Sequence, residues 1–154
     1  MRYIHNAKIT IFLKPEEYIG SNELVEKTKK IFHKLLPIDF TKEKLAINEE
    51  IVESFENRKI KIYSLDILKE AHTNLFVNTL KDLLGKESCK LLVMQKESRL
   101  DEELFFYLRI NKGYILKDMV ELTDGGDCVH IKMHIASFPK NKENALKVVN
   151  QIFG

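Results

Sequence analysis

The sequence predicts an α+β fold in which helices pack on one face of a mostly antiparallel sheet. Three observations carry this prediction. Alternating apolar and polar residues, typical of half-buried strands, occur near the N-terminus, in the middle and in the last third of the chain. Segments with apolar residues at helical spacing lie between them. The length of 154 residues, with 44% hydrophobic and 31% charged residues, suits a single domain over residues 1–154.

A strand and an amphipathic helix open the chain. Apolar residues occupy every second position from Ala7 to Leu13, which predicts a strand over residues 7–14. Ser21 or Asn22 can then cap a helix, because both side chains accept hydrogen bonds from free N–H groups. Apolar residues recur at helical spacing up to Leu36, and a proline follows, so the helix is expected to end there.

The middle of the chain is harder to read. Residues 44–55 fit a short strand followed by either a helical turn or more strand. Alternation over residues 58–63 predicts another strand. From Leu65 onward, leucines at near-helical spacing predict a long helix that Gly85 ends. Residues 86–97 fit a short helix slightly better than a strand.

The last third of the chain alternates most clearly. The expected elements are strands at residues 104–110 and 129–135, a turn at Asn111–Tyr114, a strand with Leu116, Val120 and Leu122 on one face, and a closing helix capped by Asn141. The run Asp124–Gly125–Gly126–Asp127 predicts a hairpin turn before the last strand, because paired glycines accept the backbone angles of tight hairpins.

Charge and composition exclude several classes of protein. The 25 Lys and Arg against 23 Asp and Glu give a net charge of +2, which argues against a histone-like polycation but permits one basic face. The composition excludes a disordered tail, a collagen-like repeat and a disulfide-rich miniprotein. Cys89 and Cys128 form no CxxC pair and read as reduced, buried thiols. No apolar run approaches the roughly 20 residues of a membrane span, and the N-terminus lacks a signal-peptide core, so we expect a cytoplasmic protein without membrane contact.

Common catalytic and cofactor motifs are absent from the sequence. It contains no glycine-rich phosphate loop, no HExxH and no GxSxG. The acidic run at residues 101–103 reads as a solvated loop. His130 and His134 lie four residues apart on one expected strand, about 13 Å, which is too far for one metal ion without ligands from other strands. We therefore expect no enzyme, no cofactor and no metal site.

The side chains left on the outer face of the expected sheet are the strongest functional signal. If the apolar strand faces meet the helices, the opposite face displays Lys8, Thr10, Phe12, Phe105, Tyr107, Arg109, Lys117, Met119, His130, Lys132 and His134. Aromatic rings stack RNA bases, at about 1–3 kcal/mol per base, and cations hold phosphates. An equally open interpretation is that a loop, a helix, a partner protein or a second copy of the chain covers these rings.

A second basic surface lies on the first expected helix. It consists of Lys27, Lys29, Lys30 and Lys34, diluted by Glu23 and Glu26. Charge runs of this kind are usually solvated helix faces, so phosphate binding there is the weaker interpretation.

A recognisable pattern covers residues 99–145. Its places are Arg99, Asp101, Glu102, Leu108, Arg109, Lys112, Lys132 and the corner Phe138–Pro139. This pattern resembles the C-terminal half of an archaeal family of predicted RNA-binding proteins, which have been proposed from genomic context as exosome-associated subunits. Family members are similar in fold to the large-subunit ribosomal protein that binds 5S rRNA. The resemblance therefore implies an α+β fold, RNA as the partner, and exosome- or ribosome-associated proteins as further partners.

The chain departs from the family pattern at three places. Residues 13–17 stand where the family has His-Ala-Thr-Glu-Asp, and residues 57–62 stand where it has Gly-His-x-Gly-Asn-Pro. Residues 112–116 replace Lys-Gln-Ala-Ala-Tyr. These departures are compatible with a diverged paralogue.

Together these readings predict a non-catalytic RNA-binding or RNA-processing-associated protein. The alternative is a protein–protein adaptor, or a homodimer, that uses the aromatic sheet face. Arg109 and Lys112 are expected to contact phosphates, and Phe105 and Tyr107 to stack bases. The remaining expected RNA-binding residues are Lys8, Arg99 and Lys132.

Overall fold

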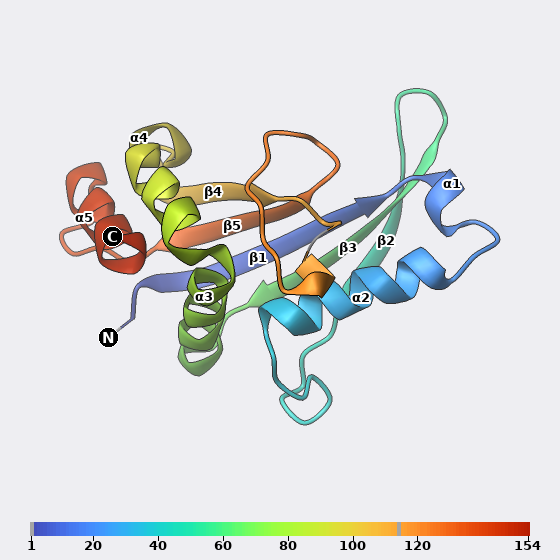
Figure 1. Ribbon diagram of the computed structural model, residues 1–154, viewed down its shortest axis with the longest axis horizontal. Coiled ribbons are helices and arrows are strands. Elements are labelled where there is room, and N and C mark those ends of the chain that lie inside the picture. The colour runs from blue at the N-terminus through green and yellow to red at the C-terminus, as the bar shows by residue number, and fades with distance from the viewer. Residues whose placement is uncertain (1, 114) are drawn as a thin grey trace.

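The computed structural model describes residues 2–113 and 115–154 and shows two layers, a sheet and a set of helices on one of its faces (Figure 1). The strands are β1 (Ile4–Leu13), β2 (Asn48–Glu53), β3 (Lys59–Ile67), β4 (Phe105–Ile110) and β5 (Val129–Ile135). The helices are α1 (Pro15–Tyr18), α2 (Glu23–Leu35), α3 (Glu70–Met94), α4 (Lys96–Arg99), the 3₁₀ turn η1 (Ile115–Lys117) and α5 (Lys142–Phe153). The sheet order is β2-β3-β1-β5-β4, and every neighbouring pair is antiparallel. The predicted α+β class is confirmed.

The core lies between the sheet and the helices, and strand alternation builds its floor. The strands contribute buried side chains at every second position: Ile9 and Ile11, Leu65 and Ile67, Phe106 and Leu108, and Ile131 and Met133. The helices close the core from the other side with Phe32, Phe76, Leu80, Val149 and Ile152. At about 25 cal/mol per Å² of apolar surface, this burial is the main stabilising contribution, and it fixes which strand face points outward.

Several predicted elements are confirmed, with small shifts at their ends. The first predicted helix corresponds to α2, and the predicted closing helix corresponds to α5. Asn141 caps the N-terminus of α5: its Oδ1 accepts a hydrogen bond from the Asn144 N–H at 2.8 Å. The open choice for residues 49–55 resolves to the edge strand β2, which begins at Asn48, so the short strand expected at residues 44–48 was wrong. Both cysteines are buried and free, as expected. Within the described residues, no helix has the length and apolarity that crossing a membrane requires.

The prediction of a helix from Leu65 to Gly85 was wrong at its start and confirmed at its end. Leu65 and Ile67 belong to β3, because they continue its alternation and pair with β1, so the helix begins only at Glu70. Gly85 interrupts the helix as predicted: its φ of 75° and ψ of 176° are non-helical, and a second helical stretch follows it to Met94, so α3 consists of two helices joined at a kink. These angles are open to glycine and strained for other residues, so this glycine permits a change of helix direction.

The predicted strand at residues 116–122 and the Gly–Gly hairpin were also wrong. β4 pairs directly with β5, and residues 111–128 form the long connection between them. Ile115, Val120 and Leu122 pack on the core from this connection, and Leu122 forms an isolated antiparallel bridge with Ile110 of β4 in place of the predicted strand. Lys117 and Met119 therefore do not lie on the sheet face. The predicted turn is present at Asn111, whose Oδ1 accepts from the Gly113 N–H at 2.8 Å, while Tyr114 lies outside the described residues.

Candidate nucleic-acid interface

The sheet face turned away from the helices, here called the outer face, carries a basic and aromatic half on β1, β5 and β4. The strand register aligns Lys8 with Lys132 and Lys132 with Tyr107, while the next row aligns His130 with Arg109. All of these side chains are half-buried or exposed. The helices that the structure describes lie on the opposite side of the sheet and leave this half of the face uncovered (Figure 1).

Three cations of this half, Lys8, Lys132 and Arg109, form no ion pair with any described residue. Arg109 instead donates from Nη1 to the backbone oxygen of Asp124 at 3.2 Å, which orients its guanidinium without neutralising it. Asp66, the β3 partner of Lys8, is the acidic side chain nearest to them in the register. The charges of the three cations are therefore available to an anion.

Aromatic rings lie in two short lines between these cations. The first line is Phe105, His134 and His5: the Phe105 and His134 rings stack at 4.5 Å between centroids, and the His134 and His5 centroids are 5.1 Å apart. The second line pairs Tyr107 with His130 at 5.8 Å. These are ordinary separations for interacting rings, so the lines hold the rings in defined positions.

Lys132 lies between the two lines of rings. Its Nζ is 4.2 Å from the Phe105 centroid and 5.8 Å from the Tyr107 centroid, which is cation–π geometry. Both the Lys132 ammonium and the His134 ring thus contact Phe105. A base that stacks on Phe105 must displace one of them.

Asp101 fixes the position of Tyr107. Its Oδ2 accepts a hydrogen bond from the Tyr107 hydroxyl at 2.9 Å, and its Oδ1 accepts from the N–H groups of Glu103 and Phe105, each at 2.9 Å. Desolvation raises the pKa of Asp101, but these hydrogen bonds outweigh it and lower the pKa of the carboxyl overall. Asp101 is therefore a structural anchor of β4 and not only a residue of a solvated loop, as the sequence had indicated.

The two histidines of β5 are held in an environment that favours their neutral form. Desolvation, followed by the charges of Arg109 and Lys132, lowers the pKa of His130 below its ordinary value. Desolvation, followed by the charges of His5 and Lys140, lowers the pKa of His134. A bound polyanion would reverse part of both shifts, because negative charge stabilises the protonated rings.

Lys112 lies apart from this half of the outer face. Its side chain is 17% exposed, and its Nζ contacts Asp127 Oδ1 at 2.6 Å, Glu17 Oε2 at 3.7 Å and the Phe12 backbone oxygen at 3.2 Å. These contacts tie the long β4–β5 connection to the end of β1. They favour a structural role, and RNA binding by Lys112 stays a prediction of the sequence.

Arg99 is also held by the protein. It donates two hydrogen bonds to Gln95 Oε1, at 2.6 and 3.0 Å, and one to the backbone oxygen of Tyr107 at 3.2 Å. Arg99 therefore braces α4 against β4, beside the Tyr107 ring. Direct contact between Arg99 and RNA likewise stays a prediction.

The basic surface of α2 is largely neutralised. Lys27 pairs with Glu23 at 3.1 Å, Lys29 lies 4.0 Å from Glu26, and Lys34 pairs with Asp118 on the β4–β5 connection. Pairs of this exposed kind contribute little stability, but they reduce the local positive potential. This geometry agrees with the expectation that phosphate binding by the α2 surface is the weaker interpretation.

The other half of the outer face is mixed. Phe12 is 42% exposed and pairs in register with Ile62 of β3, and Val52 of the edge strand β2 is 41% exposed beside Ile60. Glu50 stands opposite Ile62 on the same face. The outer face thus changes from basic and aromatic on β4 and β5 to a mixture of apolar and polar side chains at the β2–β3 end.

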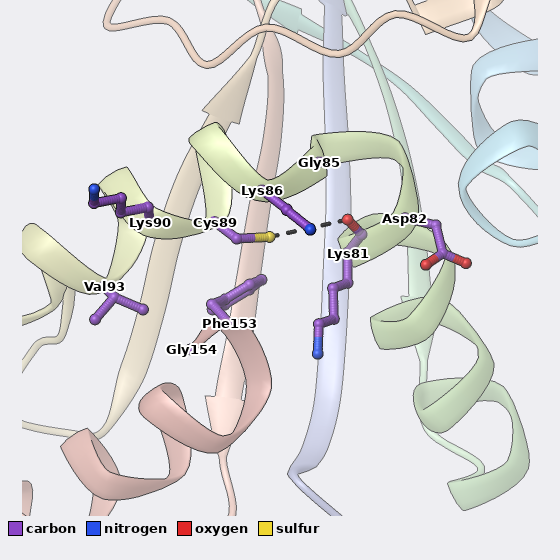
Figure 2. A pocket seen from close by; sticks show the side chains of 9 residues that line it. All are labelled: Lys81, Asp82, Gly85, Lys86, Cys89, Lys90, Val93, Phe153 and Gly154. Atoms are coloured by element: carbon purple, nitrogen blue, oxygen red, sulfur yellow. Dashed lines mark hydrogen bonds between the residues drawn. The ribbon is translucent and has the colours of Figure 1, made fainter.

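A hollow of about 570 Å³ lies on the helix side of the molecule, at the kink of α3 (Figure 2). Cys89, Val93 and Phe153 give it apolar walls, and its other lining includes the lysines of α3. The Cys89 thiol is directed at the backbone oxygen of Lys81 at 3.9 Å, and burial raises the pKa of that thiol. Cys89 is thus a protonated packing residue rather than a nucleophile.

The sequence did not point to His5 as a site residue. The first strand was expected to begin at Ala7, whereas β1 begins at Ile4 and carries an irregularity between Ile4 and Asn6. This irregularity interrupts the alternation from which a strand is recognised. The sequence therefore offered only one pointer to His5 as a site residue, namely that it is an isolated histidine next to the predicted strand. Among the described residues, no group of three or more His, Cys, Asp or Glu side chains is placed to hold a metal ion.

Comparison with known proteins agrees with this geometry. Residues 16–135 match the sequence model of a family described as RNA binding. The chain belongs to this RNA-binding family. The matched segment includes β4 and β5, which carry most of the basic and aromatic half of the outer face, whereas Lys8 and His5 precede it.

One relative and two solved structures cover nearly the whole chain. The relative is RNA-binding protein PAB1135 of Pyrococcus abyssi, 26% identical over 147 residues, which are 96% of this chain and 92% of that protein. The structure of protein AF2318 from Archaeoglobus fulgidus matches with a TM-score of 0.79 at 20% identity, covering 97% of this chain and 99% of that one. Mth689 from Methanothermobacter thermautotrophicus matches with a TM-score of 0.74 at 19% identity, covering 99% of each chain. These two structures share the fold.

Proposed function

We propose that the basic and aromatic half of the outer face binds single-stranded RNA. The observation that carries this proposal is the arrangement of three cations around the rings of Phe105 and Tyr107, on a sheet face that no described helix covers. The cations are Lys8, Lys132 and Arg109, which form no ion pair with described residues. Rings that stack bases and cations that hold phosphates are what single-stranded RNA requires. Membership of the RNA-binding family supports the same partner.

The Lys132 contact sets the order of events in this proposal. The cation–π contact over Phe105 is worth about 0.5–1 kcal/mol at an exposed site. A stacked base contributes about 1–3 kcal/mol. A base can therefore displace the Lys132 ammonium from the ring at a net gain, and the released ammonium can reach a phosphate. Asp101 keeps the Tyr107 ring in place beside it through the hydroxyl hydrogen bond.

The test compares a single-stranded and a double-stranded RNA of the same sequence. Fluorescence anisotropy with a labelled 12-nucleotide RNA should give saturable binding to the single strand and at least tenfold weaker binding to the duplex, whose bases are already stacked on each other. Phe105→Ala should weaken single-strand binding, and Leu24→Ala, an apolar truncation on the helix layer, should not. Equal affinity for both RNAs would contradict stacking on the outer face.

A second candidate function is protein contact through the β2–β3 end of the outer face. Phe12 and Ile62 pair across β1 and β3, and Ile60 and Val52 pair across β3 and β2; this apolar strip, with Glu50 beside it, is what a partner protein or a second copy of the chain would cover. The family resemblance makes exosome- or ribosome-associated proteins the proposed partner class. Light scattering of the purified chain distinguishes the two occupants: a dimer that Phe12→Asp dissociates supports self-association, and a monomer leaves this strip to another protein.

A further inference from the structure

A second hollow, of about 560 Å³, lies where β1 begins and β5 ends. Arg2 and His5 from the start of the chain, Phe138 after β5, and Asn144, Lys147 and Gln151 from α5 are among its lining residues. Its described lining residues include no Asp or Glu. The lining of this hollow therefore favours a ligand with negative charge.

Arg2 is a fixed positive charge at this hollow. Its guanidinium donates hydrogen bonds to the backbone oxygens of Ile4 at 2.9 Å, His5 at 2.6 Å and Leu68 at 2.7 Å. These three acceptors are neutral, so they orient the guanidinium without cancelling its charge. Lys147 adds a second cation from α5. The backbone oxygens engage three of the five N–H donors of the Arg2 guanidinium, and the two N–H groups of Nη1 remain for a phosphate oxygen.

Phe138 offers an open ring beside these cations. Its side chain is 97% exposed, so at least one ring face is free to stack. Asn144 and Gln151 bring amide groups that can both donate to and accept from the edge of a base. These groups match the parts of a nucleotide. The ring can stack on the base, the two cations can hold the phosphate, and the two amides can hydrogen-bond to the edge of the base.

The hollow is continuous with the basic and aromatic half of the outer face. His5 lines it, and the His5 ring lies 5.1 Å from that of His134, which stacks on Phe105 at 4.5 Å. The rings of Phe105, His134 and His5 therefore lead from the outer face into the hollow. A single strand that crosses the outer face reaches the hollow without leaving a ring surface.

We propose that this hollow binds one nucleotide of single-stranded RNA, with the base stacked on Phe138 and the phosphate held by Arg2 and Lys147. The assignment to RNA rests on the proposed function of the outer face. The occupancy of the hollow by a nucleotide does not, and it is tested separately.

The first arm of the test uses adenosine 5′-monophosphate and the full ¹⁵N-labelled chain. Backbone amide shifts should move saturably in residues 136–140 and 144–151, and Phe138→Ala should abolish the changes. Phe55→Ala is the matched control, because Phe55 is also fully exposed but lies in the β2–β3 turn, outside the lining of the hollow. No shift changes, changes confined to β4 and β5, or changes that persist in Phe138→Ala would overturn the proposal.

The second arm separates a free nucleotide from one in RNA. With a 12-nucleotide oligoadenylate, Phe138→Ala should weaken binding by roughly 5- to 150-fold, the loss of one base–ring stack, and Phe55→Ala should leave it unchanged. Equal affinity of the two variants would overturn the RNA assignment. If the oligonucleotide fails to bind while the mononucleotide still shifts residues 136–140, the proposed function of the outer face fails and the nucleotide site stands.

Discussion

Replacing Arg109 and Lys132 by alanine removes two of the three outer-face cations that form no ion pair with described residues, and leaves Lys8. On single strands, each phosphate contact adds about −0.7 to the slope of log K against log salt concentration. The three outer-face contacts contribute about −2.1 to this slope, an affinity loss of about 18-fold between 50 and 200 mM salt, in addition to what Arg2 and Lys147 contribute at the hollow. The double variant should reduce the magnitude of the slope by about 1.4, which leaves the outer face with a loss of only about 2.6-fold over the same range.

The assay is fluorescence anisotropy of a labelled 12-nucleotide RNA at four salt concentrations. The matched control is Lys29→Ala with Lys30→Ala on α2, which lowers the net charge by the same two units and should leave the slope unchanged. Lys112→Ala should also keep the slope but lower the free energy of unfolding, because it breaks the contacts with Glu17 and Asp127. A slope that falls equally in the outer-face and α2 variants would refute a localised phosphate site.

Three further predictions concern Tyr107, the two histidines of β5 and Gly85. Tyr107→Phe should lower the free energy of unfolding by about 0.5–1.5 kcal/mol, through loss of the hydrogen bond to Asp101, yet retain RNA affinity, whereas Tyr107→Ala should lose both; urea unfolding and anisotropy check this. Folding lowers the pKa of His130 and His134 below the ordinary value of 6.5, so the unfolded chain binds more protons, and the free energy of unfolding should fall as the pH drops below about 6.5. RNA affinity should rise over that range, because phosphates favour the protonated rings, and glutamine at both positions should flatten both pH profiles. Gly85→Ala should destabilise by about 1–3 kcal/mol in urea, owing to its φ of 75°, whereas Gly125→Ala, where an added Cβ makes ordinary contact, should be near neutral.

The elements that the sequence predicted well are those whose apolar residues repeat at one period. β1, β4 and β5 bury alternate side chains, and α2 and α5 bury one stripe, so each pattern had one structural solution. The connection between β4 and β5 could not be read in this way. Its apolar residues pack on the core from a loop. A few closely spaced apolar residues in a sequence do not distinguish such a loop from a strand.

The candidate site was predictable to the extent that it lies on regular strands. Alternation alone placed Lys8, Phe105, Tyr107, Arg109 and Lys132 on one face, and the register shows them on adjacent strands. The surroundings of Lys112 and Arg99 were not predictable, because their hydrogen-bonding and ion-pair partners come from other segments of the fold. Charge type can be read from a sequence, but the partner of a charge depends on tertiary contacts.

Ultraviolet cross-linking of a single-stranded RNA, followed by mass spectrometry of the cross-linked peptides, tests RNA binding by the outer face most directly. We expect cross-links on β4 and β5, at Phe105, Tyr107 and His134, because these rings would lie against the bases. Cross-links confined to α2 or to the hollow at the α3 kink, with none on β4 and β5, would show that RNA binds the helix side and would contradict the proposed interface.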